Sequence, residues 1–153
     1  MKWVERAAWA AAIVGLSMRF AGLPGAGVLV VLGFSTAAVV YFPLGWLSLG
    51  GPAGGRELVP LSLITGLVLS LLCVGMLFTI QHWPGADFSL LMGLLGAVVL
   101  TVTIITLHVR KQATEAYLNG LRYRVLLIGL AGLLTYLLAD HLPAIGQAAA
   151  SAH

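Results

Sequence analysis

The stretch Gln81-His82-Trp83-Pro84-Gly85-Ala86 is a polar turn set between two long apolar runs. Sixty residues earlier, Ala21-Gly22-Leu23-Pro24-Gly25-Ala26 stands at the same place in the hydrophobic pattern. Adjacent proline and glycine mark a tight turn between regular elements. Each stretch therefore predicts a hairpin of two apolar helices, and together they predict that this hairpin occurs twice in the same orientation.

The composition around these turns is that of a membrane protein. Of 153 residues, 60% are hydrophobic and 8% are charged, whereas soluble domains carry about 25% charged residues. Several apolar runs approach the ~20 residues that cross a bilayer core of about 30 Å. Helices satisfy their own backbone hydrogen bonds in lipid. The sequence predicts an all-α integral membrane protein with no separate soluble domain.

Five transmembrane helices are expected. The run from Ala7 to Phe20 has the length of a signal-peptide core, but its place in the repeat favours a retained first helix, Val4–Gly22. Pro60 suits the first turn of the third helix, where a missing N–H costs little, and Asp87 is placed to cap the fourth. The expected segments are a first hairpin (1–49), a Gly/Pro linker (50–57), a second hairpin (58–109), a basic cytoplasmic linker (110–122), a fifth helix (123–143) and a disordered tail (144–153).

The charge distribution predicts the orientation. With a cytoplasmic N-terminus and five spans, every Lys and Arg except Arg19 falls on the cytoplasmic side, as the positive-inside rule requires of short loops. Both Pro-Gly-Ala turns then lie on the outer side. The net charge of +3 is therefore a loop bias, and nucleic-acid binding is not expected.

Small residues recur at one-turn spacing in the expected helices. Gly33 and Ala37 lie four apart, as do Gly93 and Ala97, so that a neighbouring backbone can approach closely. Two interpretations stay open: packing within the chain, or a surface for another subunit. Aligned sixty residues apart, the pairs Gly15/Gly75, Gly33/Gly93, Ala37/Ala97 and Val39/Val99 match, in addition to the two turns.

The run from Gly75 through Phe78-Thr79-Ile80-Gln81-His82-Trp83-Pro84-Gly85-Ala86, followed by Leu91-Met92-Gly93-Leu-Leu, resembles the N-terminal two-helix membrane region of the gliding-motility and type IX secretion protein family GldL. That family forms the inner-membrane part of a motor, surrounds its partner GldM and uses proton flow. The resemblance implies a membrane hairpin within a larger inner-membrane complex.

The chain departs from the family pattern at two charged positions. The family's basic residue three before the histidine falls on Thr79, and its membrane glutamate falls on Gly96. No acidic residue is expected inside a predicted span. Because intramembrane ionisable groups relay protons in such machines, these departures argue against motor activity.

The candidate functional residues lie at the second turn. His82 and Trp83 have no counterpart in the first turn, so any specialised role is expected at these two residues, together with Pro84, Gly85 and Asp87. The alternative is that they only form a turn at the membrane interface. Arg19 is expected to extend to the headgroups or to pair with Asp87. Four residues of types that bind zinc are expected on the outer side: His82, Asp87, Asp140 and His141. They are too widely spaced along the chain to predict a metal site. We expect no bound metal, no cofactor and no catalytic residue.

The sequence favours a non-catalytic membrane protein that packs as a small subunit, with the lipid bilayer, further copies of itself or a larger membrane complex as its partners. One alternative is a stator-like or proton-conducting component of a gliding or secretion motor. The other is a small transporter or metal-handling protein, which rests on the outer His and Asp residues.

Overall fold

The computed structural model describes residues 2–42, 59–110 and 115–139, which form helices and turns and no strand. The expected linker 50–57, the tail 144–153, Asp140 and His141 lie outside the described residues. The helices are α1 (Lys2–Phe20), α2 (Ala26–Tyr41), α4 (Val59–Gln81), α5 (Ala86–Val109) and α6 (Glu115–Leu138).

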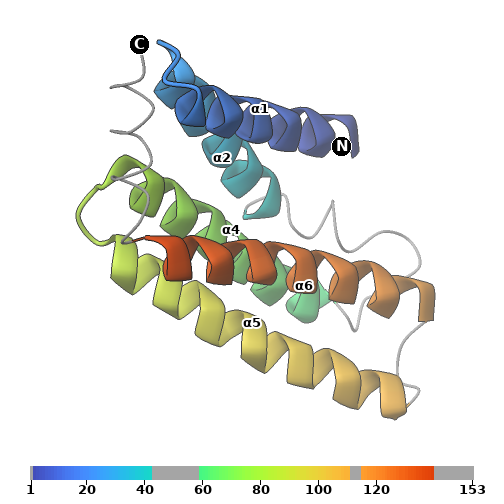
Figure 1. Cartoon of the computed structure of the whole chain (residues 1–153). Coiled ribbons are helices and arrows are strands. Elements are labelled where there is room, and N and C mark those ends of the chain that lie inside the picture. The colour runs from blue at the N-terminus through green and yellow to red at the C-terminus, as the bar shows by residue number, and fades with distance from the viewer. Residues whose placement is uncertain (1, 43–58, 111–114, 140–153) are drawn as a thin grey trace.

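Two antiparallel hairpins form most of the fold. Helix α1 packs on α2, and α4 packs on α5. Helix α4 is central, since it also contacts α2 and α6, and α6 packs on both α4 and α5. In Figure 1, α1 and α5 form opposite outer layers, with α2 and α4 between them.

Glycines bring the first hairpin together. A Cβ on Gly33 would lie 2.5 Å from the backbone nitrogen of Ala12, and a Cβ on Gly15 would lie 2.7 Å from that of Val30. The two backbones are therefore in direct contact at both points, which small residues in membrane helices permit.

The second hairpin makes the same contacts sixty positions on. A Cβ on Gly75 would lie 2.7 Å from the Leu90 backbone, and one on Gly93 would lie 2.9 Å from the Leu72 side chain. Each pair has its counterpart in the first hairpin. Gly33 and Gly93 therefore each contact a neighbouring helix of the same chain.

Three of the described helices are long and apolar enough to cross a membrane: Val59–Gln81, Ala86–Val109 and Tyr117–Leu138 within α6. Helix α2 is a shorter apolar helix. Pro60 is the second residue of α4, as predicted, because the first turn needs no donor from it.

The last helix begins earlier than expected. The sequence predicts a linker up to residue 122 and a helix from 123, but α6 already begins at Glu115. Its first turns bury Tyr117, Leu118 and Leu121, which are spaced to share one helix face. Asn119, which lies between them, is exposed, and the apolar run on which the predicted helix rested begins only at Val125.

Candidate functional site

The turn after α4 is a helix C-terminal motif. The His82 backbone has φ 56°, in the left-handed region. Its N–H donates to the carbonyl of Thr79 at 3.2 Å, and the Trp83 N–H donates to that of Phe78 at 2.9 Å. This is the bonding pattern of a Schellman motif, in which a left-handed residue ends the helix.

The Trp83 side chain completes this motif. Its ring packs against that of Phe78 in a T-shaped arrangement with centroids 5.4 Å apart, the apolar contact that commonly accompanies a Schellman ending. Helix α1 of the first hairpin ends in the same way, with Gly22 at φ 68° and the Leu23 N–H donating to the Met18 carbonyl. The geometry of His82 and Trp83 is thus that of a helix ending.

Replacing His82 with glycine is expected to stabilise the protein by about 1 kcal/mol. A side chain in the left-handed region costs roughly 1–2 kcal/mol, and glycine recovers most of this although it is freer in the unfolded chain. Thermal unfolding in detergent, followed by circular dichroism, measures the change. A loss of stability would show that the exposed imidazole makes a stabilising contact.

The other side of the turn differs from the prediction at Asp87. Gly85, at φ 85°, is the N-cap of α5, and no side chain caps the helix there. Asp87 lies in the first turn, exposed, so the prediction that it caps the helix is wrong. Its charge still favours the helix N-terminus through the macrodipole. Pro84 is exposed and lies between the end of α4 and the Gly85 N-cap of α5.

Arg19 joins the two hairpins. Its Nη1 donates to Gln81 Oε1 at 3.2 Å, and Gln81 Nε2 donates to the Gly27 carbonyl at 3.1 Å. The described residues show no bond between Arg19 and Asp87, the alternative partner expected from the sequence. Gln81, at the end of α4, therefore links both ends of the first turn to the second hairpin.

A second polar network lies at the opposite end of α1. Arg124 of α6 forms a two-pronged ion pair with Glu5, with Nε–Oε1 at 3.0 Å and Nη2–Oε2 at 3.1 Å. The Tyr41 hydroxyl donates to Glu5 Oε1 at 2.7 Å and accepts from Trp9 Nε1 at 3.2 Å. Four side chains thus connect α1, α2 and α6.

Glu5 is the residue that sequence reasoning missed. It lies in the range predicted for the first span, so the expectation of no acidic residue there is wrong. Its partners are 36 and 119 residues away, and only the folded chain brings them together. The sequence does contain one signal for this contact: Glu5 and Tyr41 each lie within a predicted membrane helix. Because buried polar groups need hydrogen-bond partners, two such residues are candidates to bind each other.

The Glu5 carboxylate is the anchor of this network. It accepts two hydrogen bonds from the Arg124 guanidinium and one from the Tyr41 hydroxyl. Hydrogen bonds between a guanidinium and a carboxylate are stronger than those between neutral groups.

A cavity of about 630 Å³ lies beside this network. Helices α1 and α6 line it, and the Glu5–Arg124 pair bridges them. The cavity is lined by Glu5, Arg6, Trp9, Ala10, Ile13, Gly120, Tyr123 and Arg124.

A further polar contact joins α4 to α6. The hydroxyls of Ser62 and Tyr117 lie 2.7 Å apart.

The described residues contain no group of three His, Cys, Asp or Glu side chains placed to hold a metal ion. His82 and Asp87 are both exposed near the second turn.

The chain matches no known protein-family model, no curated protein and no solved structure. Its residues and their geometry are therefore the basis for the functional conclusion.

Proposed function

We propose that this protein is a non-catalytic, multi-pass inner-membrane protein that serves as a small packing and interaction subunit. It would assemble with copies of itself or within a larger membrane complex. In this proposal all five described helices cross the membrane, the N-terminus is cytoplasmic, and the two hairpins are copies of one ancestral unit.

The observation that carries the proposal is how the interhelical polar side chains are used. Glu5, Tyr41 and Arg124 join three helices, and Arg19 and Gln81 join the two hairpins. Every buried side-chain nitrogen and oxygen in the described residues has a hydrogen-bond partner. These groups fix helices in place, which is the arrangement of a scaffold.

The positions of the basic residues support the orientation. The Glu5–Arg124 pair joins the N-terminal end of α1 to the N-terminal half of α6, so Arg6 and Arg122 belong to the same end of the bundle. Arg110 follows α5 at its C-terminus, one short connection before α6. Basic residues at one end of a helix bundle favour that end being cytoplasmic.

The glycine contacts support the duplication. Gly15 with Val30 and Gly33 with Ala12 in one hairpin correspond to Gly75 with Leu90 and Gly93 with Leu72 in the other. A left-handed residue follows both α1 and α4, at Gly22 and His82. Chance matches between apolar segments are common, but matching contacts and turn conformations at one constant offset are not.

Mild detergent extraction tests the proposed function. Once the mass of bound detergent is subtracted, the protein should have a mass well above the 16.0 kDa of one chain, because it elutes with copies of itself or with defined membrane partners. Transfer to lipid nanodiscs at low protein density keeps the lipid environment while diluting accidental contacts. A lone monomer in both media, with no partner recovered from its native membrane, would contradict the proposal.

A proton-conducting component is the second candidate, favoured by the Glu5 carboxylate and its hydrogen-bonded chain to Trp9. The GldL-like alternative places the conducting glutamate at Gly96, where a Cβ would lie 2.7 Å from the Val68 side chain. Proton flux into liposomes that disappears with Glu5→Gln would support this candidate. Equal flux in protein-free liposomes would remove it.

A further inference from the structure

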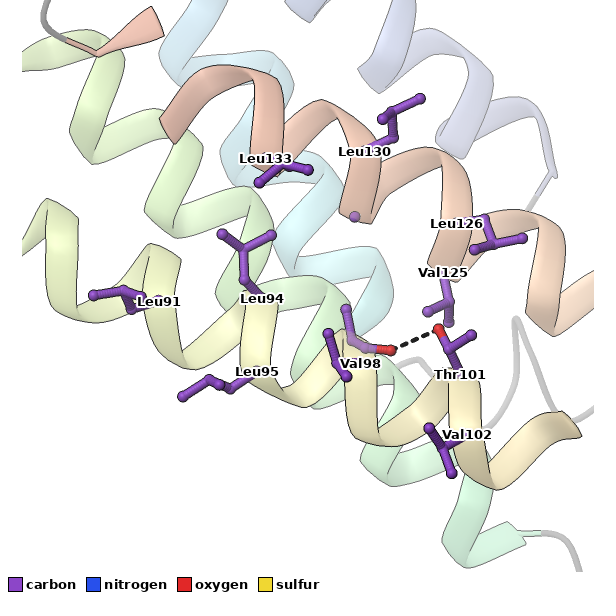
Figure 2. Close-up of a pocket in the computed structure, with 12 residues that line it drawn as sticks. Leu91, Leu94, Leu95, Val98, Thr101, Val102, Val125, Leu126, Leu130 and Leu133 are labelled. Carbon is purple, nitrogen blue, oxygen red and sulfur yellow. Dashed lines mark hydrogen bonds between the residues drawn. The ribbon is translucent and has the colours of Figure 1, made fainter. Parts of the chain in front are cut away.

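A groove of about 500 Å³ runs between α5 and α6. Figure 2 shows leucine and valine side chains from both helices along it. The hydroxyl of Thr101, its one polar side chain, donates to the Ala97 carbonyl at 2.7 Å and so is already satisfied. The groove therefore offers an apolar surface along its whole length, and both of its walls belong to candidate membrane spans.

A separate polar hollow lies beyond one end of the groove. Past Val102 and Val125, residues further along the same two helices line this small hollow of about 60 Å³. On α5 the steps to Ile105 and His108 are three residues each, and on α6 Arg122 precedes Val125 by three, which keeps them on one helix face. The hollow is lined by Ile104, Ile105, His108, Leu118, Asn119 and Arg122.

Arg122 differs from two other arginines in its partners. Arg124 is bound to Glu5, and Arg19 to Gln81. Arg122 and Asn119 are exposed and form no hydrogen bond or ion pair with the described residues. Among the described residues, the donors of Arg122 and Asn119 are thus unpaired in a hollow that follows the apolar groove.

We propose that this groove binds one anionic phospholipid. Its phosphate would lie against Arg122 and Asn119, with His108 beside them, and one acyl chain would follow the groove toward Leu91. Arginine offers a planar fork of donors that matches phosphate. From His108 to Val98 is about 15 Å at about 1.5 Å per residue, which equals half of a bilayer core of about 30 Å.

A second copy of the chain is a poorer occupant of the groove. Two copies related by an axis along the membrane normal would meet the same surface patch at the same depth. Each would then bring its Arg122 toward the other's, and like charges repel. A lipid phosphate neutralises the charge that a second copy would double.

Native mass spectrometry of the full chain in mild detergent tests the site. Phosphatidylglycerol and phosphatidylcholine with identical acyl chains are the probes. The wild type should bind the anionic lipid more tightly, and Arg122→Gln should weaken that binding about fivefold, since one basic residue near an anionic surface contributes about 1 kcal/mol. The matched control is Arg6→Gln, which removes an exposed charge outside this groove.

Gly129→Leu supplies a second variant that acts on the acyl chain. Gly129 lines the groove, and a Cβ there would make an ordinary 3.6 Å contact with Ala97, so the longer side chain fills the channel. It should lower the binding of both lipids. The proposal is overturned if Arg6→Gln weakens binding as much as Arg122→Gln, if the two lipids bind equally to the wild type, or if Gly129→Leu abolishes a dimer instead of lipid binding.

Discussion

Replacing Gly33 with alanine is expected to lower the free energy of unfolding by about 2–3 kcal/mol. The added Cβ would lie 2.5 Å from the nitrogen and 2.7 Å from the Cα of Ala12, so a whole helix must move. Overpacking of this kind typically costs 1–3 kcal/mol. Gly93→Ala should cost less, about 1 kcal/mol, because the nearest atom there, at 2.9 Å, belongs to the Leu72 side chain, which can rotate, and the Leu72 backbone nitrogen lies at 3.0 Å instead of 2.5 Å.

The control for this pair is Gly120→Ala. Gly120 lies within α6, and a Cβ there meets nothing within 4 Å. Alanine in a helix interior is favoured over glycine by about 0.8–1.0 kcal/mol, so this variant should be neutral or more stable. Unfolding in a mixed-micelle titration gives all three values. If Gly33→Ala is as stable as Gly120→Ala, α1 and α2 are not in backbone contact.

Replacing Glu5 with glutamine is expected to destabilise the protein by about 2 kcal/mol. The change leaves the Arg124 guanidinium without its carboxylate. Breaking a buried ion pair costs about 3–5 kcal/mol, and the partial exposure of the two side chains, 25% for Arg124 and 16% for Glu5, reduces that cost. Asp87→Asn is the control, since Asp87 is exposed and its loss should change stability by less than about 0.5 kcal/mol.

A double-mutant cycle with Arg124→Met isolates the interaction. If the pair acts as the structure indicates, the double variant should be less destabilised than the two single variants together, by about 1–2 kcal/mol. Replacing both partners removes the unpaired charge that each single change leaves behind. Strict additivity of the two changes would contradict the contact.

Local sequence signals predicted the parts of the fold that depend on neighbours along the chain. Pro24-Gly25 and Pro84-Gly85 indicated the turns, and the apolar runs indicated the helices on each side. Two predictions about helix ends were wrong. The N-cap of α5 is the left-handed Gly85 and not Asp87, and α6 begins early because tertiary packing buries one face of its first turns. Neither has a strong signal in the sequence.

The candidate site was harder to predict because its residues are far apart. The two turns differ at His82 and Trp83, where the first turn has Gly22 and Leu23, and this difference predicted a specialised role. The structure places both residues in a motif that ends helix α4. Glu5, Tyr41 and Arg124 come from three helices and meet only after folding. Their pairing follows from the arrangement of α1, α2 and α6, which the hydrophobic pattern does not specify.

Cysteine labelling of the two turns tests the central claim, that the two hairpins lie in the membrane in one orientation. Cysteines at Pro24 and Pro84, both exposed, would be introduced into a Cys73→Ala background, with Arg6→Cys and Arg122→Cys as reporters of the other end. A membrane-impermeant maleimide should label both turns from outside the cytoplasmic membrane and the two arginine positions only after that membrane is permeabilised. Labelling of Pro24→Cys and Pro84→Cys from opposite sides would contradict the account.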